Sequence, residues 1–100
     1  MQIERRVRAI LDSEAEAIKA VSIDASYGKA VELIETCAGK IITTGMGKAS
    51  FVANKFAAIL SSTATPAVFI PPAEAAHGDL GMLAPGDCIV AFSTSGKTRE

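Results

Sequence analysis

The sequence is poor in the residues that build metal sites, disulfide frameworks and large aromatic cores. Its 100 residues include no tryptophan, one tyrosine, four phenylalanines, two cysteines and one histidine. Cys37 and Cys88 stand far apart in apolar surroundings, so they make neither a disulfide framework nor a zinc site. The single histidine, His77, excludes a histidine-based metal cluster, and we expect no bound metal. Unpaired cysteines of this kind are typical of a reducing, cytoplasmic compartment.

An excess of charge of either sign is also missing. Lys and Arg number 10 and Asp and Glu number 11, a net charge of -1. Binding to nucleic acid or to an anionic membrane through bulk charge needs a basic excess, so we expect neither partner. No apolar run is long enough to span a bilayer, and the first residues do not form a signal peptide. Hydrophobic residues make up 49% of the chain, many of them alanines, which indicates a globular chain with a thin core.

Apolar side chains at helical spacing predict three helices. The first runs from Ile3 to about Val21, and the second begins near Asp24, a good N-cap. The second helix is expected to continue to about Cys37, and Gly39 is placed to end it in the left-handed conformation. Ser50 is expected to cap the third helix, which the hydroxyl cluster 61–63 ends.

Short, continuously apolar segments at 40–44, 67–70 and 88–92 predict strands that alternate with these helices. This order indicates an α/β domain, a three-layer αβα sandwich with a parallel, Rossmann-like sheet covered on both faces. Ligands bind at the carboxyl ends of the strands in such sheets. The loops 45–50 and 93–98 both lie at these ends, so we expect them to open on the same side and share one site.

The second of these loops has the sequence S-T-S-G-K-T, which places several hydroxyl side chains just before the expected start of a helix. Ser93, Thr94, Ser95 and Thr98 would form a cradle for a phosphate, and the alternative is an ordinary Ser/Thr turn with a cap. Two nucleotide motifs nearly fit. The first glycine of a Walker A motif falls on Ala91, and the third glycine of the Rossmann fingerprint falls on Ser50. A nucleotide-binding domain is therefore the weaker alternative.

Three motifs together suggest a family. G-M-G-K at 45–48, P-A-E-A-A-H-G-D-L-G-M at 72–82 and S-x-S-G-K-T-x-E at 93–100 resemble the sugar isomerase (SIS) domain family, and most of all its arabinose-5-phosphate isomerases. The resemblance implies a five-stranded parallel sheet, of which about three strands are present here. Residues 1–100 are then part of an SIS domain, with N-terminal helices in 1–39 and both substrate loops in 40–100. No CBS domain is present, and we expect the chain to be the front part of a longer polypeptide.

The resemblance also implies roles for individual residues. Lys48 would orient the substrate, Glu100 would transfer the proton, and His77 would contact the site, with Glu74 less so and Asp79 holding its loop. Substrate-binding residues would be Gly47, Ser50, Ser93, Thr94, Ser95 and Thr98. Without the motifs, Lys48 is a solvated loop lysine, Glu100 a first-turn glutamate and His77 a structural histidine. Ala49 and Lys97 depart from the family pattern, which commonly has serine and glutamate there.

The implied activity is the aldose–ketose interconversion of D-arabinose 5-phosphate and D-ribulose 5-phosphate through an enediol. In this family it supplies Kdo for lipopolysaccharide or capsule synthesis. The chemistry requires no cofactor, because a positioned carboxylate can move the proton between the two carbons. A homo-oligomer, often a tetramer, is implied as well. The alternative is a non-catalytic, regulatory SIS module that binds a phosphosugar without turning it over.

Overall fold

Three parallel strands form the sheet of this chain. The computed structural model describes residues 1–72 and 83–94, and its strands are β1 (Ile41–Gly45), β2 (Ala67–Phe69) and β3 (Cys88–Phe92). β1 lies in the centre, in the order β2-β1-β3, and pairs in parallel with both neighbours. The predicted α/β class and parallel sheet are therefore confirmed, and the three strands lie within a residue or two of where the apolar segments placed them.

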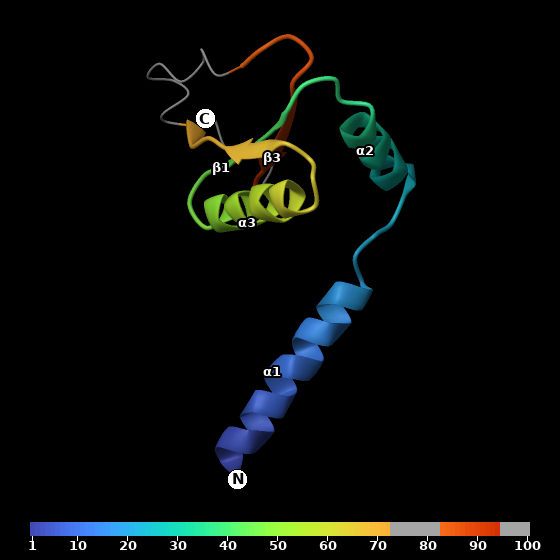
Figure 1. Cartoon of the computed structure of the whole chain (residues 1–100). Helices are drawn as coiled ribbons and strands as arrows, with labels where there is room; N and C mark the ends of the chain where they lie inside the picture. Colours follow the sequence, from blue (N-terminus) through green and yellow to red (C-terminus); the bar gives the residue numbers. More distant parts are fainter. Residues whose placement is uncertain (73–82, 95–100) are drawn as a thin grey trace.

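Helix α3 (Ala49–Ser62) connects β1 to β2 and packs across one face of the sheet (Figure 1). Ala53 and Ala57 are its buried residues, and their small side chains let the helix lie close to β1. The fully buried Thr43 faces the helix, and its hydroxyl donates a 2.7 Å hydrogen bond to the carbonyl of Ala53. Phe56 of α3 meets Phe92 of β3 edge to face, with ring centroids 5.5 Å apart. The thin, alanine-rich core expected from the composition is thus built around β1.

The other face of the sheet is less covered in the part of the chain that the structure describes. Ile89 of β3 points away from α3, because it alternates with the half-buried Val90, and it is 57% exposed. The connection from β2 to β3 includes residues 73–82, which lie outside the described residues. The parallel sheet and its α3 layer are therefore shown, whereas the second helical layer stays a prediction.

An ion pair ties β3 to β1 at the amino end of the sheet. The Asp87 carboxylate accepts hydrogen bonds from the Lys40 ammonium at 2.7 Å, from the Lys40 backbone N–H at 3.0 Å and from the Ala84 N–H at 2.8 Å. The Lys40 side chain and these two N–H groups lower the pKa of Asp87 from 3.8 to about 2. The Asp87 side chain is only 6% exposed, and β3 begins at the next residue, Cys88, opposite Ile41. The contact between Asp87 and Lys40 therefore holds the start of β3 beside the start of β1.

Gly39 does not end the second helix, so that expectation was wrong. Helix α2 (Ala25–Glu35) ends at Glu35 with Thr36 as its C-cap, and Gly39 does not have a positive φ. A side chain at Gly39 would instead collide with Asp87, so glycine is required there by the ion pair just described. The start of α2 agrees with the prediction, since the Asp24 carboxylate accepts from the Ser26 N–H.

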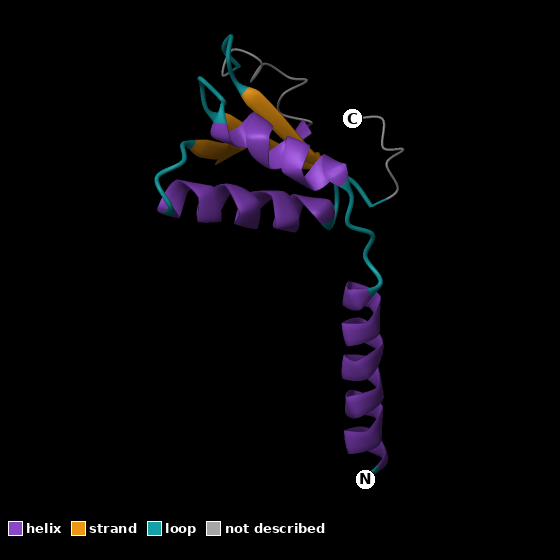
Figure 2. Cartoon of the chain, turned by 90° about the vertical axis from the view of Figure 1, so that its right-hand side faces the viewer, coloured by secondary structure: helices purple, strands orange, loops and turns teal. Residues whose placement is uncertain are grey.

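Helix α1 (Gln2–Lys19) extends away from the sheet, as Figures 1 and 2 show. None of its residues is buried, although its apolar side chains recur along one side as the sequence predicted. Across residues 1–72 and 83–94, no helix is both long and apolar enough to cross a membrane.

Candidate active site

The strand order brings the two predicted loops to one edge of the sheet. Gly45, the last residue of β1, is in register with Phe92, the last residue of β3. From β1 the chain turns to one side to form β2 and then returns to the other side of β1 to form β3. In parallel α/β sheets, ligands bind at the carboxyl ends of the strands. The candidate site is this edge, between β1 and β3.

Gly45 determines how closely the two loops approach. A Cβ atom at this position would lie 2.9 Å from the Ala49 carbonyl oxygen and 3.1 Å from the Phe92 carbonyl oxygen. Both contacts are with backbone, so no side-chain rotation would relieve them. Gly47 has a different requirement, because its φ of 58° lies in the left-handed region that favours glycine. The two glycines of G-M-G-K therefore let the loop turn tightly from β1 into α3.

Ser50 does not cap α3, which corrects the expectation from the sequence. The helix begins at Ala49 with Lys48 as its N-cap residue, and Lys48 makes no side-chain cap. Ser50 lies in the first turn, where its hydroxyl donates a 2.6 Å hydrogen bond to the Gly47 carbonyl. Its proton is used within the loop, so Ser50 can offer a ligand only its oxygen lone pairs.

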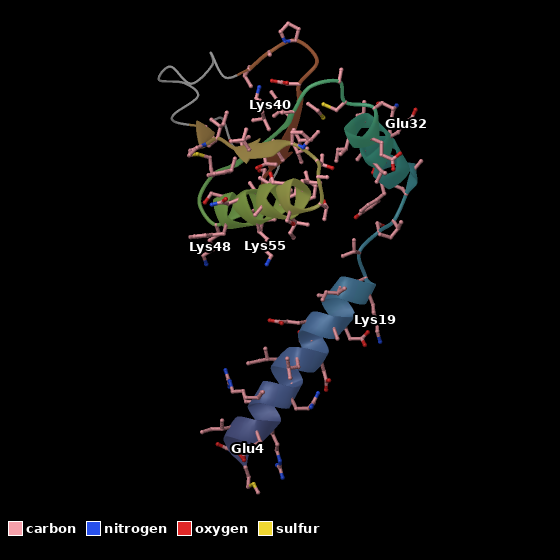
Figure 3. The ribbon with its side chains drawn as sticks, in the orientation of Figure 1. Glu4, Lys19, Glu32, Lys40, Lys48 and Lys55 are labelled. Carbon is pink, nitrogen blue, oxygen red and sulfur yellow. The ribbon has the colours of Figure 1, made fainter. Side chains whose placement is uncertain are left out.

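Lys48 is exposed at the start of α3. Figure 3 shows its side chain on the side of α3 that faces away from the sheet. The side chain of Lys55, farther along the helix, lies on the same side. Within the described residues Lys48 takes part in no ion pair. The structure therefore places the backbone of Lys48 at the candidate site, while its side chain points away from the sheet.

Only part of the hydroxyl loop is described. Ser93 and Thr94 follow β3 directly and are exposed, next to the end of β1. Ser95, Lys97, Thr98 and Glu100 lie outside the described residues, as do Glu74, His77 and Asp79. The structure thus brings together the first loop with Ser93 and Thr94, and the roles expected for the other residues stay predictions.

Thr44 is a candidate that the sequence did not single out. It precedes Gly45 on β1, in register with Ala91, and lies on the face opposite Thr43 and α3. Its hydroxyl oxygen is buried and has no hydrogen-bond partner among the described residues. Buried hydroxyls are nearly always partnered, so this unpartnered oxygen singles out Thr44 among the described residues of the edge. In the sequence Thr44 is indistinguishable from any β-branched strand residue.

No group of three or more His, Cys, Asp or Glu side chains in residues 1–72 and 83–94 could hold a metal ion. Cys37 and Cys88 are both free thiols. The groups that the described edge offers are hydroxyls and backbone groups, with one exposed lysine at its margin, which suit the binding of a small polar molecule.

Comparisons with known proteins identify the family of this chain. A family model of the SIS domain matches residues 36–100. The chain is 43% identical over 100 residues to the arabinose 5-phosphate isomerase KdsD of Yersinia pestis, and it spans 28% of that relative.

Two solved structures share the fold. One is described as a phosphosugar isomerase involved in capsule formation from Bacteroides fragilis, with a TM-score of 0.94 and 42% identity over 97% of this chain. The other, from Escherichia coli, is in complex with arabinose 5-phosphate and has a TM-score of 0.90 and 33% identity over 97% of this chain. The chain covers 53% of each of these two structures.

Proposed function

The chain belongs to the SIS domain family, and from this membership we propose that it carries the first part of a phosphosugar isomerase site. The substrate pair is D-arabinose 5-phosphate and D-ribulose 5-phosphate, in support of Kdo and of lipopolysaccharide or capsule synthesis. One observation supports the site directly: the G-M-G-K and hydroxyl loops leave adjacent strands, with Gly45 in register with Phe92. The names of the relatives support the substrate.

In this proposal the hydroxyl loop holds the phosphate, and the sugar lies along the edge toward the first loop. Ser93, Thr94, Ser95 and Thr98 provide hydroxyl donors, and a buried Thr44 hydroxyl provides one more polar contact. Lys48 reaches the sugar by rotating its long side chain, which no described ion pair restrains. Gly47 and Ser50 shape the loop, and Ser50 contributes an acceptor.

Isomerisation needs one base and no external oxidant. A carboxylate takes the proton from C2 of the aldose while the carbonyl oxygen on C1 gains one, which forms the enediol. The O2 hydroxyl then loses its proton and C1 gains one, so the ketose forms with atoms and electrons balanced. Glu100 is the proposed base, and His77 is the proposed second contact with the reacting end.

Steady-state turnover of D-arabinose 5-phosphate by the full-length protein tests this function. We expect Glu100→Gln to lower kcat by roughly 10²- to 10⁴-fold, the usual contribution of a general base. Lys48→Ala should lower kcat/KM, whereas Lys55→Ala, a lysine on the same side of the same helix, should change neither constant. Unchanged turnover in Glu100→Gln and Lys48→Ala would refute the assignment. Phosphosugar binding without turnover by the unmodified protein would favour the regulatory SIS module.

We further propose a homo-oligomer, such as a tetramer, in the cytoplasm. The two free cysteines are compatible with a reducing compartment. The absence of a basic excess is the reason we propose no nucleic-acid partner.

A further inference from the structure

A second cavity, of about 340 Å³, lies at the amino end of the sheet. It begins at Ile41, the first residue of β1, whereas the candidate active site begins at Gly45, the last residue of that strand. On the right of Figure 1, α2 lies at the end of the sheet where the strands start, and its last two residues line the cavity. The walls include Ile34, Glu35, Cys37, Ile41, Thr65 and Pro66. The volume is within the range of small-molecule sites, and the cavity is separate from the proposed phosphosugar loops.

Hydrogen bonds between distant segments hold these walls together. The Ile41 N–H donates to the Pro66 carbonyl at 2.8 Å, and the Thr65 N–H donates into the last turn of α3 at 2.9 Å. The Cys37 thiol donates to the Gly86 carbonyl at 3.2 Å, so its proton is already used. Because the walls are joined before anything binds, a ligand pays little for ordering them.

Two polar side chains in the cavity are unpartnered. Among residues 1–72 and 83–94, neither the Glu35 carboxylate nor the Thr65 hydroxyl takes part in a hydrogen bond or an ion pair. Glu35 is exposed at the mouth, and Thr65 is half-buried beside the apolar wall. Both can therefore contact a ligand without giving up a contact within the protein.

The charge around this cavity is negative. Glu35 ends α2, and Ala64 and Thr65 directly follow the C-cap residue of α3. The carbonyl end of a helix favours a cation, so these two helix ends reinforce the Glu35 carboxylate. Among the described residues no lysine or arginine lines the cavity, and the Lys40 ammonium is held by Asp87 at 2.7 Å. An anion such as a sugar phosphate is therefore disfavoured here.

We propose that this cavity binds a primary ammonium group carried on a short aliphatic chain. The ammonium donates to the Glu35 carboxylate and to the Thr65 hydroxyl oxygen, and the aliphatic chain lies against Ile34, Ile41 and Pro66. An ammonium has only donors, which match two unpartnered oxygens. A bare Ca²⁺ or Mg²⁺ ion needs more oxygen ligands than these two side chains provide. The inference goes beyond the proposed isomerase activity and does not rest on it.

Three probes of equal chain length test the ligand class by calorimetric titration of the full-length protein. At neutral pH n-pentylammonium carries a positive charge, n-pentanol carries none and n-pentanoate carries a negative charge. We expect pentylammonium to bind with a dissociation constant roughly in the millimolar range, as suits so small a ligand. Pentanol and pentanoate should each bind roughly tenfold more weakly, because neither forms the charge-assisted contact with Glu35.

Variants of the two polar side chains test the contacts. Glu35→Gln keeps the shape of the side chain but removes its charge, so it should weaken pentylammonium binding roughly three- to tenfold. Thr65→Val removes the hydroxyl and should weaken it roughly two- to fivefold. Glu32→Gln is the matched control, because Glu32 is an exposed carboxylate in the last turn of α2 that does not line the cavity. At physiological salt its effect should stay below about twofold.

Thiol alkylation by iodoacetamide locates the bound probe. Cys37 lines the cavity and Cys88 does not, although both are half-buried free thiols. Mass spectrometry of the two cysteine-containing peptides measures both alkylation rates in one sample. Pentylammonium should slow the alkylation of Cys37 relative to that of Cys88.

The proposal is supported if pentylammonium binds more tightly than both other probes, Glu35→Gln reduces that preference and Cys37 is protected. It is overturned if pentanol binds as tightly as pentylammonium, if Glu35→Gln binds like the wild-type protein, or if the probe slows both cysteines equally. Absence of any pentylammonium binding overturns it as well. Turnover of D-arabinose 5-phosphate without the probe reports on the proposed isomerase activity alone, so the two proposals can fail separately.

Discussion

Gly45→Ala is expected to strain the edge where the two loops leave the sheet. The added Cβ would lie 2.9 Å from the Ala49 carbonyl oxygen, 3.0 Å from the Ala49 carbonyl carbon and 3.1 Å from the Phe92 carbonyl oxygen, whereas ordinary contact begins at 3.4 Å. Because all three neighbours are backbone atoms, the start of α3 or the end of β3 must move by up to about 0.5 Å. Overpacking of this kind costs about 1–3 kcal/mol of unfolding free energy.

Two other glycines provide matched controls for the same substitution. Gly28 lies inside α2 with nothing within 4 Å of an added Cβ, so Gly28→Ala should raise the unfolding free energy by about 0.5–1 kcal/mol. An added Cβ at Gly47 also meets open space, but the φ of this residue is 58°. Gly47→Ala should therefore lower the unfolding free energy by about 1 kcal/mol through backbone strain alone. The three variants therefore separate steric crowding, helix propensity and strain.

Urea unfolding followed by circular dichroism measures all three differences. The expected order of stability is Gly28→Ala above wild type, then Gly47→Ala, then Gly45→Ala. A Gly45→Ala midpoint at or above that of the wild-type protein would refute the steric argument, and a destabilised Gly28→Ala would refute the placement of Gly28. If the proposed function is right, Gly45→Ala should also raise KM for the phosphosugar, because the two loops are pushed apart.

Thr43→Val should lower the unfolding free energy by about 1 kcal/mol, because it removes the buried 2.7 Å hydrogen bond to the Ala53 carbonyl. Thr44→Val should leave stability equal or higher, since its buried hydroxyl has no described partner, yet it should weaken phosphosugar binding in a titration. Asp87 has a pKa of about 2, below its value of 3.8 when unperturbed, so its contribution to stability is complete above about pH 4 and is lost as the pH falls toward 2. Melting temperatures from pH 5 to pH 2 should show this loss, and Asp87→Asn should flatten that part of the curve; an unaltered curve would contradict the role of the Lys40 contact.

The local structure followed from the sequence because its causes are local. The Asp24 cap, the helical spacing in α1 and the apolar run at 88–92 each depend on residues a few positions apart. One error arose where a distant residue intervened. Gly39 is a glycine because Asp87 approaches it, and Asp87 is 48 positions away in the chain. The error at Ser50 was local: the N-cap residue of α3 is Lys48, two positions earlier, and the Ser50 hydroxyl donates to the Gly47 carbonyl within the loop.

The candidate site was predictable only in outline. The G-M-G-K and hydroxyl motifs indicated that two loops matter, and the rule for parallel sheets placed both at carboxyl ends of strands. That the two loops are neighbours depends on the strand order β2-β1-β3, which no local pattern encodes. Thr44 was missed for the same reason, because its burial beside Ala91 exists only once β3 pairs with β1.

The sequence by itself determined the element types, the family motifs and the scarcity of metal-binding residues, since these depend on composition and on short-range spacing. Tertiary structure decided the rest: the edge that β1 and β3 share, the contact of Lys40 with Asp87 and the exposure of the apolar side chains of α1. The physical reason is that burial and strand pairing join residues far apart in the chain. An amphipathic helix has the same sequence pattern whether it packs its apolar face on the sheet of its own chain or extends away from that sheet. Helix α1 extends away from it.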